Sequence, residues 1–472
     1  MSGFRKLTSF LTAVAIILNF YIYTYPSFNS DKCSWYLPNK EEAEATLSPF
    51  QKKLIAVPYI GDLFDQYFVG TSGIDKELTL KNGKSPQDIR MLLFGDPQIK
   101  GNWPSTPYIT RLDTFGNDYY LGHIYNTMKR RLKPTHISVM GDLFSSQWIL
   151  DREFFNRSKR YMTRLFPRPK EHTGDLLEFI TENDGCNWSE FMNWFQATLD
   201  SDSFQFGYED VNDWTSANLI DEPLFINISG NHDIGNGDAT YQHMARFIKI
   251  MGKDNFFIEY ALRTDHPWRI VVLNSLAVDG PFIEQKFIDY TWSFVNKLKE
   301  RPFNGSTILL THVPFYKEEG ICADAPFVEY FNESNSKIDY MFGKIKSENH
   351  LQYQSSQDIL NAIFQNDKSG IILTGHDHEG CESIYNKLDN GTWVASKKIE
   401  SNKYVKEIVV RSMMGEFGGN SGLMTAHFNK EAQDWEFHYT LCPFTVQHVW
   451  WVTKVTTILS ILFNSICFLF NY

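Results

Sequence analysis

Both ends of this 472-residue chain are apolar, and this feature constrains the fold more than any other. Residues 7–25 read LTSFLTAVAIILNFYIYTY, and residues 448–470 form a second run rich in Val, Ile, Leu and Phe. A helix of about 20 residues covers roughly 30 Å and can therefore cross the hydrocarbon of a membrane. Two crossings place both termini on one side of the membrane and everything between them on the other.

The residues beside these runs predict their orientation. Arg5 and Lys6 precede the first run, and basic residues favour the cytoplasmic side, so residues 1–6 and 471–472 are predicted to be cytoplasmic. Residues suited to the membrane interface open the second run at Trp450, Trp451 and Lys454. Two alternatives stay open: a cleaved signal peptide at the N-terminus, and an amphipathic or buried helix at the C-terminus.

The part between the runs has the composition of a lumenal protein. It contains five of the six cysteines, which allows two disulfides and one remaining thiol, at Cys33, Cys186, Cys322, Cys381 and Cys442. It also contains sequons at Asn156, Asn187, Asn227, Asn304, Asn332 and Asn390. The formal charge of -11 argues against a nucleic-acid partner, which needs a basic surface.

Short apolar strands alternate with helical stretches in this middle part. Strands are predicted at residues 89–95, 136–141, 224–229, 268–274, 307–311 and 370–374, and helices at 119–132, 239–251, 282–300 and 357–365. This alternation predicts an α/β fold with helices outside the sheet and ligands at the carboxyl ends of the strands. Three later strands, at 408–413, 422–428 and 435–441, could complete a second sheet.

These patterns divide the chain into segments. A lumenal extension is predicted over residues 26–88 and the main domain over 89–444, with an insertion at 145–221 over the rim of the polar end.

Five polar clusters follow successive predicted strands. They are Gly95-Asp96-Pro97-Gln98, Gly141-Asp142, Gly230-Asn231-His232-Asp233, Thr311-His312 and Gly375-His376-Asp377-His378. Each cluster alone is more often an ordinary turn or a structural histidine. Together they supply carboxylates, carboxamides and imidazoles, which are ligands of divalent cations, and in number they suit two cations about 3.5–4 Å apart. Cys322 and Cys381 each follow one of these clusters within about a dozen residues, so we predict that they pair and brace the rim.

In chain order the clusters GD, GD, GNHD, TH and GHDH resemble the calcineurin-like metallophosphoesterase superfamily over about residues 90–441. The resemblance implies a four-layer α/β/β/α sandwich and metal-assisted hydrolysis of a phosphodiester. Longer stretches such as GDPQIKGNWPSTPYITRLDTFGNDYY, THVPFYKEEG and MMGEFGGNSG resemble a narrower family of fungal endoplasmic-reticulum enzymes. Members of that family remove ethanolamine phosphate from the second mannose of GPI anchors. The resemblance thus implies GPI-anchored proteins as substrates, p24-type cargo receptors as partners, and a catalytic domain in the lumen.

The superfamily pattern also implies a role for each residue of the clusters. Asp96 and His378 would hold the first metal, and Asp142 would bridge the two metals. The second metal would be held by Asn231, His312 and His376. His232 would contact the phosphate or protonate the leaving oxygen, and Asp233 would orient that imidazole.

Two positions depart from the superfamily pattern. The acidic residue that often follows the second motif is missing, since Ser145 and Ser146 stand there, and the other departure concerns a metal ligand. Gln98 stands where the superfamily usually has a histidine ligand of the first metal. A carboxamide oxygen is a harder ligand than an imidazole nitrogen, so Gln98 shifts the predicted metal from zinc toward Mn(2+) or Mg(2+), and Mn(2+) is the metal predicted. The ethanolamine ammonium would need a counter-charge, for which the candidates are Glu318, Glu319, Asp324 and Glu416.

Two other functions remain open from the sequence. One is a lumenal metallophosphoesterase that acts on another sugar- or lipid-linked phosphate and uses the same metal ligands. The other is a non-enzymatic membrane adaptor for cargo export that has kept a structural metal.

Overall fold

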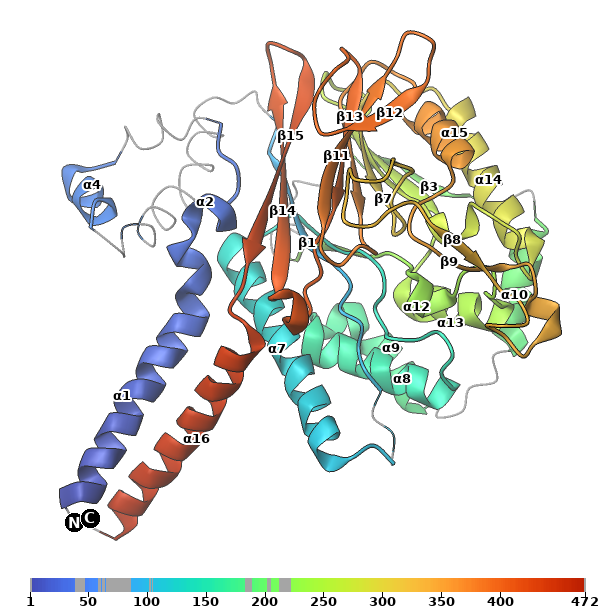
Figure 1. Ribbon diagram of the computed structural model, residues 1–472. Coiled ribbons are helices and arrows are strands. Elements are labelled where there is room, and N and C mark those ends of the chain that lie inside the picture. Colours follow the sequence, from blue (N-terminus) through green and yellow to red (C-terminus); the bar gives the residue numbers. More distant parts are fainter. Residues whose placement is uncertain are drawn as a thin grey trace.

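The protein consists of a two-sheet domain and a pair of long helices that project from it side by side (Figure 1). The computed structural model describes residues 2–38, 47–57, 61, 64, 86–101, 103, 105–182, 189–201, 205–211 and 222–470. Much of the predicted extension 26–88 lies outside these residues. So do parts of the predicted insertion 145–221, which include Cys186 and the sequon at Asn187.

The projecting helices are α1, Ser2–Thr24, and α16, Gln447–Leu469. Both are long and apolar enough to cross a membrane, and most of their surface is exposed. Small polar side chains join them: Thr12 Oγ1 lies 3.0 Å from Ser460 Oγ, and Asn19 Nδ2 donates to Thr457 Oγ1 at 2.8 Å. Such hydrogen bonds between apolar helices are a common means of association in membranes. The two helices therefore flank the domain as a transmembrane pair, with both chain ends together (Figure 1).

The first sheet has the order β15-β14-β1-β2-β4. Its parallel centre consists of β1, Ile89–Phe94, β2, His136–Val139, and β4, Leu224–Asn227. The strands β14, Asn420–Asn429, and β15, Asp434–Pro443, extend it in antiparallel register, with Leu92 opposite Leu423.

The second sheet has the order β12-β11-β13-β10-β7-β6-β5-β3. Four of its strands are parallel: β6, Trp268–Val272, β7, Ser306–Leu310, β10, Gly370–Thr374, and β13, Tyr404–Val409. The remaining strands are β3, Gly207–Val211, β5, Phe256–Tyr260, β11, Cys381–Lys387, and β12, Trp393–Ser396. A hairpin of β8, Val328–Tyr330, and β9, Ile345–Glu348, stands beside this sheet.

Alternate side chains of the strands fill the space between the sheets. Met91 and Leu93 of β1 pack in one buried cluster with Ile371 and Leu373 of β10, whereas Leu92 and Phe94 belong to the cluster on the helical side. This period of two is what a strand buried on both faces requires.

Helices cover the outer faces. The first sheet is covered by α7, Tyr108–Leu132, and the second by α14, Gln285–Glu300, and α15, Tyr353–Ile363 (Figure 1). Helix α8, Asp151–Arg160, packs on the loops after β1 and β2, where Phe154 contacts Phe144. The predicted four-layer α/β/β/α sandwich is confirmed.

The structure differs from the predicted elements in two places. Helix α7 begins eleven residues before the predicted 119. Its first turns are exposed, and its contact with α16 comes at Gly116, where a Cβ would overlap the Trp451 ring. The segment 145–221 contributes helices α8, α9, Lys170–Glu182, and α10, Ser189–Leu199, and then the edge strand β3. This segment is therefore partly a layer of the sandwich.

The buried sequon at Asn227 is not available for glycosylation in the folded domain. Its Nδ2 donates to Met251 O at 2.9 Å, and its Oδ1 accepts from the Tyr161 hydroxyl at 2.5 Å. A glycan on this amide would remove both bonds from the core.

Two disulfides connect distant parts of the chain. Cys322 pairs with Cys381, as predicted. Cys33 pairs with Cys442, which ties the short helix α2, Ser30–Cys33, to β15. Cys467 in α16 is free.

Candidate metal centre

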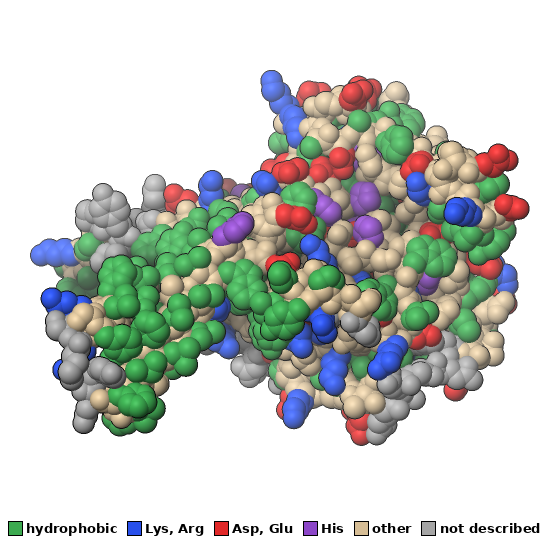
Figure 2. Space-filling view, turned by 60° about the horizontal axis from the view of Figure 1, so that its bottom comes forward, with side chains coloured by type: hydrophobic (Ala, Val, Ile, Leu, Met, Phe, Trp, Pro, Cys, Tyr) green, Lys and Arg blue, Asp and Glu red, His purple; other side chains and the backbone are tan. Residues whose placement is uncertain are grey.

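The five polar clusters all lie at the carboxyl ends of parallel strands. Asp96 follows β1, Asp142 follows β2, and Asn231 follows β4 in the first sheet; His312 follows β7 and His376 follows β10 in the second. The two sheets present these ends on one side of the sandwich, so segments up to 280 residues apart meet there. Figure 2 shows histidine side chains on this face of the domain, beside the apolar surface of the projecting helices.

The backbone turns sharply at these strand ends. Asp96, Gln98, Asp142 and His376 have φ values of 41°, 40°, 48° and 75°, and they are four of the seven non-glycine residues with positive φ in the described chain. This left-handed conformation costs free energy for residues with a Cβ and concentrates at functional sites. Here it turns each side chain from the strand direction toward the centre.

Asp96, Asp142 and His378 form one half of the centre. One ligand atom from each lies within 4.8 Å of the others. Gln98 lies in the same place: its Nε2 donates to Asp142 Oδ2 at 3.1 Å and is 3.2 Å from His378 Nε2. To offer its oxygen to a metal, the Gln98 amide would rotate by half a turn, which exchanges the positions of its oxygen and nitrogen.

Asn231, His312 and His376 form the other half. Asn231 Oδ1 is 3.1 Å from both His312 Nε2 and His376 Nδ1, and His312 Nε2 is 3.4 Å from Asp142 Oδ1. Asp142 therefore lies between the halves, as a bridging carboxylate must.

Hydrogen bonds to backbone carbonyls fix the orientation of two rings. His312 Nδ1 is 2.7 Å from Met140 O, and His376 Nε2 is 2.8 Å from Glu348 O. Because a carbonyl only accepts, each of these nitrogens is the protonated one, which leaves His312 Nε2 and His376 Nδ1 with lone pairs toward Asn231 and the centre. This arrangement fits metal ligation.

Electrostatics also favour a cation here. Burial raises the pKa of the Asp96 carboxyl well above its usual range, and the neighbouring Asp142 raises it further. For Asp142, burial acts in the same direction, but the nearby His312 and His232 lower its pKa overall. Burial lowers the pKa of His376 to about 4, which keeps that imidazole neutral, the form that binds metal. Two crowded buried carboxylates and neutral imidazoles are a donor set for divalent cations.

His232 faces the centre, whereas Asp233 points away from it. The His232 ring is 39% exposed, and its Nε2 is 3.7 Å from Asp142 Oδ2, so it faces both the centre and solvent. The predicted orientation of this ring by Asp233 is wrong. The Asp233 carboxylate points away and accepts three backbone N–H bonds, from Gly230, Leu143 and Phe144, at 2.9–3.1 Å. It holds the two loops together, since three convergent amides satisfy a buried carboxylate better than one exposed imidazole.

Sequence reasoning named Gly230 and Gly141 without giving them a role, and it missed other neighbours of the centre. Gly230 and Gly141 allow the close approach of Asp142 and His312, because a Cβ at either glycine would overlap those residues. Phe417, in the short helix η6, Gly415–Phe417, packs against the His378 ring with centroids 4.9 Å apart. The sequence Gly-Glu-Phe-Gly-Gly at 415–419 is a weak signal of a close approach, whereas nothing in the sequence marks Glu348 as the residue behind His376.

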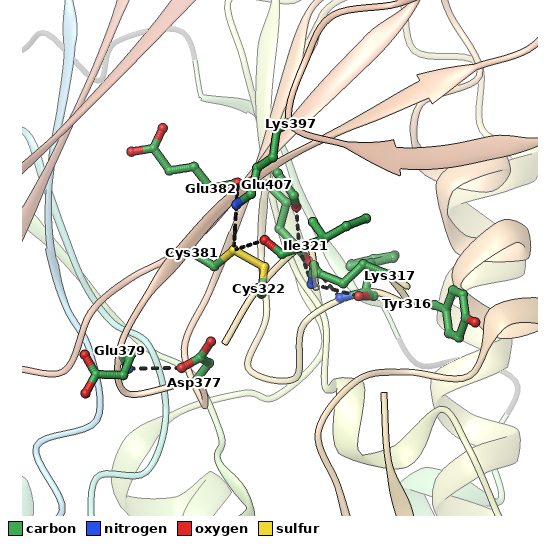
Figure 3. Close-up of a disulfide and its surroundings, with 12 residues drawn as sticks. Tyr316, Lys317, Ile321, Cys322, Asp377, Glu379, Cys381, Glu382, Lys397 and Glu407 are labelled. Atoms are coloured by element: carbon green, nitrogen blue, oxygen red, sulfur yellow. Dashed lines mark hydrogen bonds and ion pairs between the residues drawn. A yellow bond between two sulfur atoms is a disulfide. The ribbon is translucent and has the colours of Figure 1, made fainter. Parts of the chain in front are cut away.

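The rim of the centre is held by the disulfide and a buried ion pair (Figure 3). Cys322–Cys381 joins the loop after His312 to the start of β11. Below it, Lys317 Nζ lies 2.7 Å from Glu407 Oε2, with both side chains fully buried. Glu407 also accepts the Phe315 N–H at 2.7 Å. The loop that carries His312 is thus fixed to β13.

Lys317→Met is expected to lower the free energy of unfolding by roughly 3–5 kcal/mol, because it leaves Glu407 as an uncompensated buried charge. The midpoint of thermal unfolding of the full chain in detergent measures this loss. The matched control is Lys346→Met, which removes a pair with Glu329 whose side chains are 34% and 35% exposed, and which is expected to cost about 1 kcal/mol or less. Equal losses in the two variants would contradict the prediction.

The two-sheet sandwich and its strand-end motifs define a metallophosphoesterase, here with a transmembrane helix at each end. No protein-family model matches the chain. Protein TED1 of Saccharomyces cerevisiae is 49% identical over 475 residues, which cover 97% of each chain, and this chain belongs to the family of that protein. An uncharacterized protein of Schizosaccharomyces pombe is 27% identical over 354 residues, 70% of this chain and 67% of that one.

Solved structures give only distant matches. A dimetal phosphatase of Danio rerio is 10% identical, covers 76% of this chain and 99% of its own, and has a TM-score of 0.34. GAP50 of Plasmodium, described as the anchor in the inner membrane complex, is 11% identical, covers 77% of this chain and 90% of its own, and has a TM-score of 0.33.

Proposed function

We propose that this metallophosphoesterase is a phosphodiesterase of the endoplasmic-reticulum lumen that removes ethanolamine phosphate from the second mannose of GPI anchors. By doing so it would promote the export of GPI-anchored proteins, with p24-type cargo receptors as partners. The observation that carries the proposal is the position of the centre next to the membrane helices.

A short series of contacts connects the centre to the membrane. The His378 ring packs on Phe417, and Gly415 at the other end of the same short helix lies against Gln447, the first residue of α16. This short helix thus links the centre to the transmembrane segment. A substrate whose glycan is attached to a lipid in the same membrane is presented at this height, whereas a soluble substrate would need no such placement.

The chain's own residues supply the acid for the reaction. The His232 imidazole is exposed beside Asp142 and can donate a proton to the sugar oxygen as its bond to phosphorus breaks. When bound, two divalent cations would supply Lewis-acid stabilisation of the phosphoryl oxygens and lower the pKa of the attacking water. Oxygen donors from Asp96, Asp142, Gln98 and Asn231 favour Mn(2+) among the candidate metals.

Two carboxylates are placed to bind the ethanolamine ammonium. Asp324 and Glu416 both lie close enough to His378 to affect its charge or be affected by it. Burial, followed by the charge of Asp377, raises the pKa of Asp324, so an added cation at this position would be stabilised. Glu318, Glu319 and Glu416 are all exposed, but of these three Glu416 is the one whose charge acts on His378.

Replacing both carboxylates, in Asp324→Asn/Glu416→Gln, is expected to raise KM at least about tenfold for a phosphoethanolamine diester, because charged hydrogen bonds to the ammonium are lost. A hydroxyethyl phosphate diester, which lacks the ammonium, is expected to show no such change. Steady-state kinetics with both substrates measure the difference. The matched control Glu318→Gln/Glu319→Gln should leave both KM values unchanged, and an equal rise for the two substrates would contradict the prediction.

Mass spectrometry of GPI glycans from cells that carry Asp142→Asn tests the function. We expect the ethanolamine-phosphate branch on the second mannose to accumulate. A normal glycan profile would refute the proposal. Normal glycans together with hydrolysis of another sugar- or lipid-linked phosphate by the wild-type protein would favour a different substrate. Unchanged export of GPI-anchored proteins in the Asp142→Asn cells would favour the adaptor function.

A further inference from the structure

A cavity of about 760 Å³ opens between the transmembrane pair and the domain. Four parts of the chain line it: the end of α1, the start of α16, α7 from Tyr119 onward, and the helical turn Tyr161–Leu165 with Pro167 beyond it. It is separate from the metal centre, and its residues have no place in the proposed chemistry.

The cavity lies at the level of the membrane surface. Tyr23 is in the last turn of α1, and Trp450 and Lys454 are in the first two turns of α16; Lys454 Nζ is 5.5 Å from the Tyr23 ring and 5.4 Å from the Trp450 ring. Aromatic rings and lysine stems gather at the boundary between lipid tails and headgroups. An exposed apolar row on α7 continues this boundary, at Ile109, Leu112, Phe115 and Tyr119.

The lining is strongly cationic. Arg130, Arg131, Arg164 and Lys454 line the cavity, and none of the described residues that line it is Asp or Glu. Arg164 shares Asp118 with Arg160, and Arg131 binds the carbonyls of Pro26 and Cys33. Arg130 and Lys454 have no acidic partner among the residues that the structure describes, so their charges are available to an anion.

This charge pattern discriminates between phospholipid headgroups. Phosphatidylserine, phosphatidylethanolamine and phosphatidylcholine all carry an ammonium, which the charges of Arg130 and Lys454 would repel. Phosphatidylinositol carries a phosphodiester and a neutral ring of hydroxyls. Asn126, Thr127 and Thr163 provide neutral polar groups along the same wall.

We infer that the cavity binds the phosphoinositol headgroup of a membrane lipid. This inference rests on the proposed function, because phosphatidylinositol is the membrane end of a GPI anchor. Tyr119 lines the cavity, its neighbour Tyr120 lies against Gly419, and Phe417 contacts His378, so the glycan of a lipid held here would extend toward the metal centre. One end of the substrate is held by cations and the other by carboxylates, which sets the direction of binding.

Native mass spectrometry of the full chain with an equimolar mixture of phosphatidylinositol, phosphatidylserine and phosphatidylcholine tests the inference. Phosphatidylinositol is expected to be the main bound lipid. In Arg130→Gln/Lys454→Gln its affinity is expected to fall roughly 30-fold, since each cation near an anionic lipid contributes about fivefold. The charge-conserving Arg130→Lys/Lys454→Arg should retain most of the binding, and the control Lys299→Gln/Lys337→Gln, which removes two exposed lysines elsewhere, should retain all of it.

The bound metal content and the thermal midpoint of each variant show whether it has folded. Equal binding of phosphatidylserine, or unchanged phosphatidylinositol binding in Arg130→Gln/Lys454→Gln, would overturn the inference. Because lipid binding requires no hydrolysis, this result is independent of the glycan profile of Asp142→Asn cells. If the protein binds the lipid but the glycans of Asp142→Asn cells are normal, the proposed function is refuted and the lipid-binding inference stands.

Discussion

Asp142→Asn is expected to lower kcat/KM for phosphodiester hydrolysis by on the order of 10³-fold or more, because metal ions contribute several kcal/mol to such reactions. Asp142 lies between the two halves of the centre, with one oxygen 3.4 Å from His312 Nε2 and the other 3.1 Å from Gln98 Nε2. An amide in its place keeps the shape but loses the charge that two cations would share. Hydrolysis of bis(p-nitrophenyl) phosphate by the full chain in Mn(2+) measures the rate.

Elemental analysis of the same samples separates loss of metal from loss of folding. The wild type is expected to hold about two divalent ions per chain and Asp142→Asn fewer. The control is Asp254→Asn, which changes a buried carboxylate outside the centre. Asp254 accepts a hydrogen bond from Asn274 Nδ2 at 3.0 Å, and the variant should keep its metals. Full metal content with the wild-type rate in Asp142→Asn would refute the bridging role.

The clusters after the strands could be predicted because local sequence defines them. A compact apolar run followed by Gly-Asp or Gly-His marks the end of a buried strand, and parallel strands bring such ends to one edge. The positions of Asp96 and Asp142 follow from this rule alone. Their mutual approach also requires the glycines beside them, and the left-handed backbone at both residues shows that the convergence is held by the whole fold.

What depends on contacts between distant segments could not be predicted. The superfamily pattern implies that Asp233 orients His232, yet Asp233 binds amides of the loop after β2. The pairing of Cys322 with Cys381 followed from their closeness to two converging clusters. The pairing of Cys33 with Cys442 had no such signal, since it depends on where the extension after α1 meets the far edge of the first sheet.

His232→Gln is expected to lower kcat by about 10²–10⁴-fold for a diester with an alkyl leaving group, because general acid catalysis contributes that much to the expulsion of an alkoxide. Glutamine keeps polarity and approximate length but has no proton to transfer near neutral pH. The ring it replaces is exposed and binds no metal in the assignment above, so the metal content should stay at the wild-type value. Single-turnover kinetics with a sugar-linked phosphoethanolamine diester measure the chemical step.

The leaving group decides whether the lost group was an acid or a phosphate contact. A p-nitrophenolate leaves without a proton, so with that substrate His232→Gln should be slowed by no more than about tenfold. A residue that only bound the phosphate would slow both substrates equally, and that outcome would refute the acid role. His172→Gln, a change of an exposed histidine on α9, is the control for the substitution itself. Because the acid is needed only for a poor leaving group, a strong difference between the two substrates would also indicate that the natural substrate expels an alkoxide, as a mannose oxygen would be.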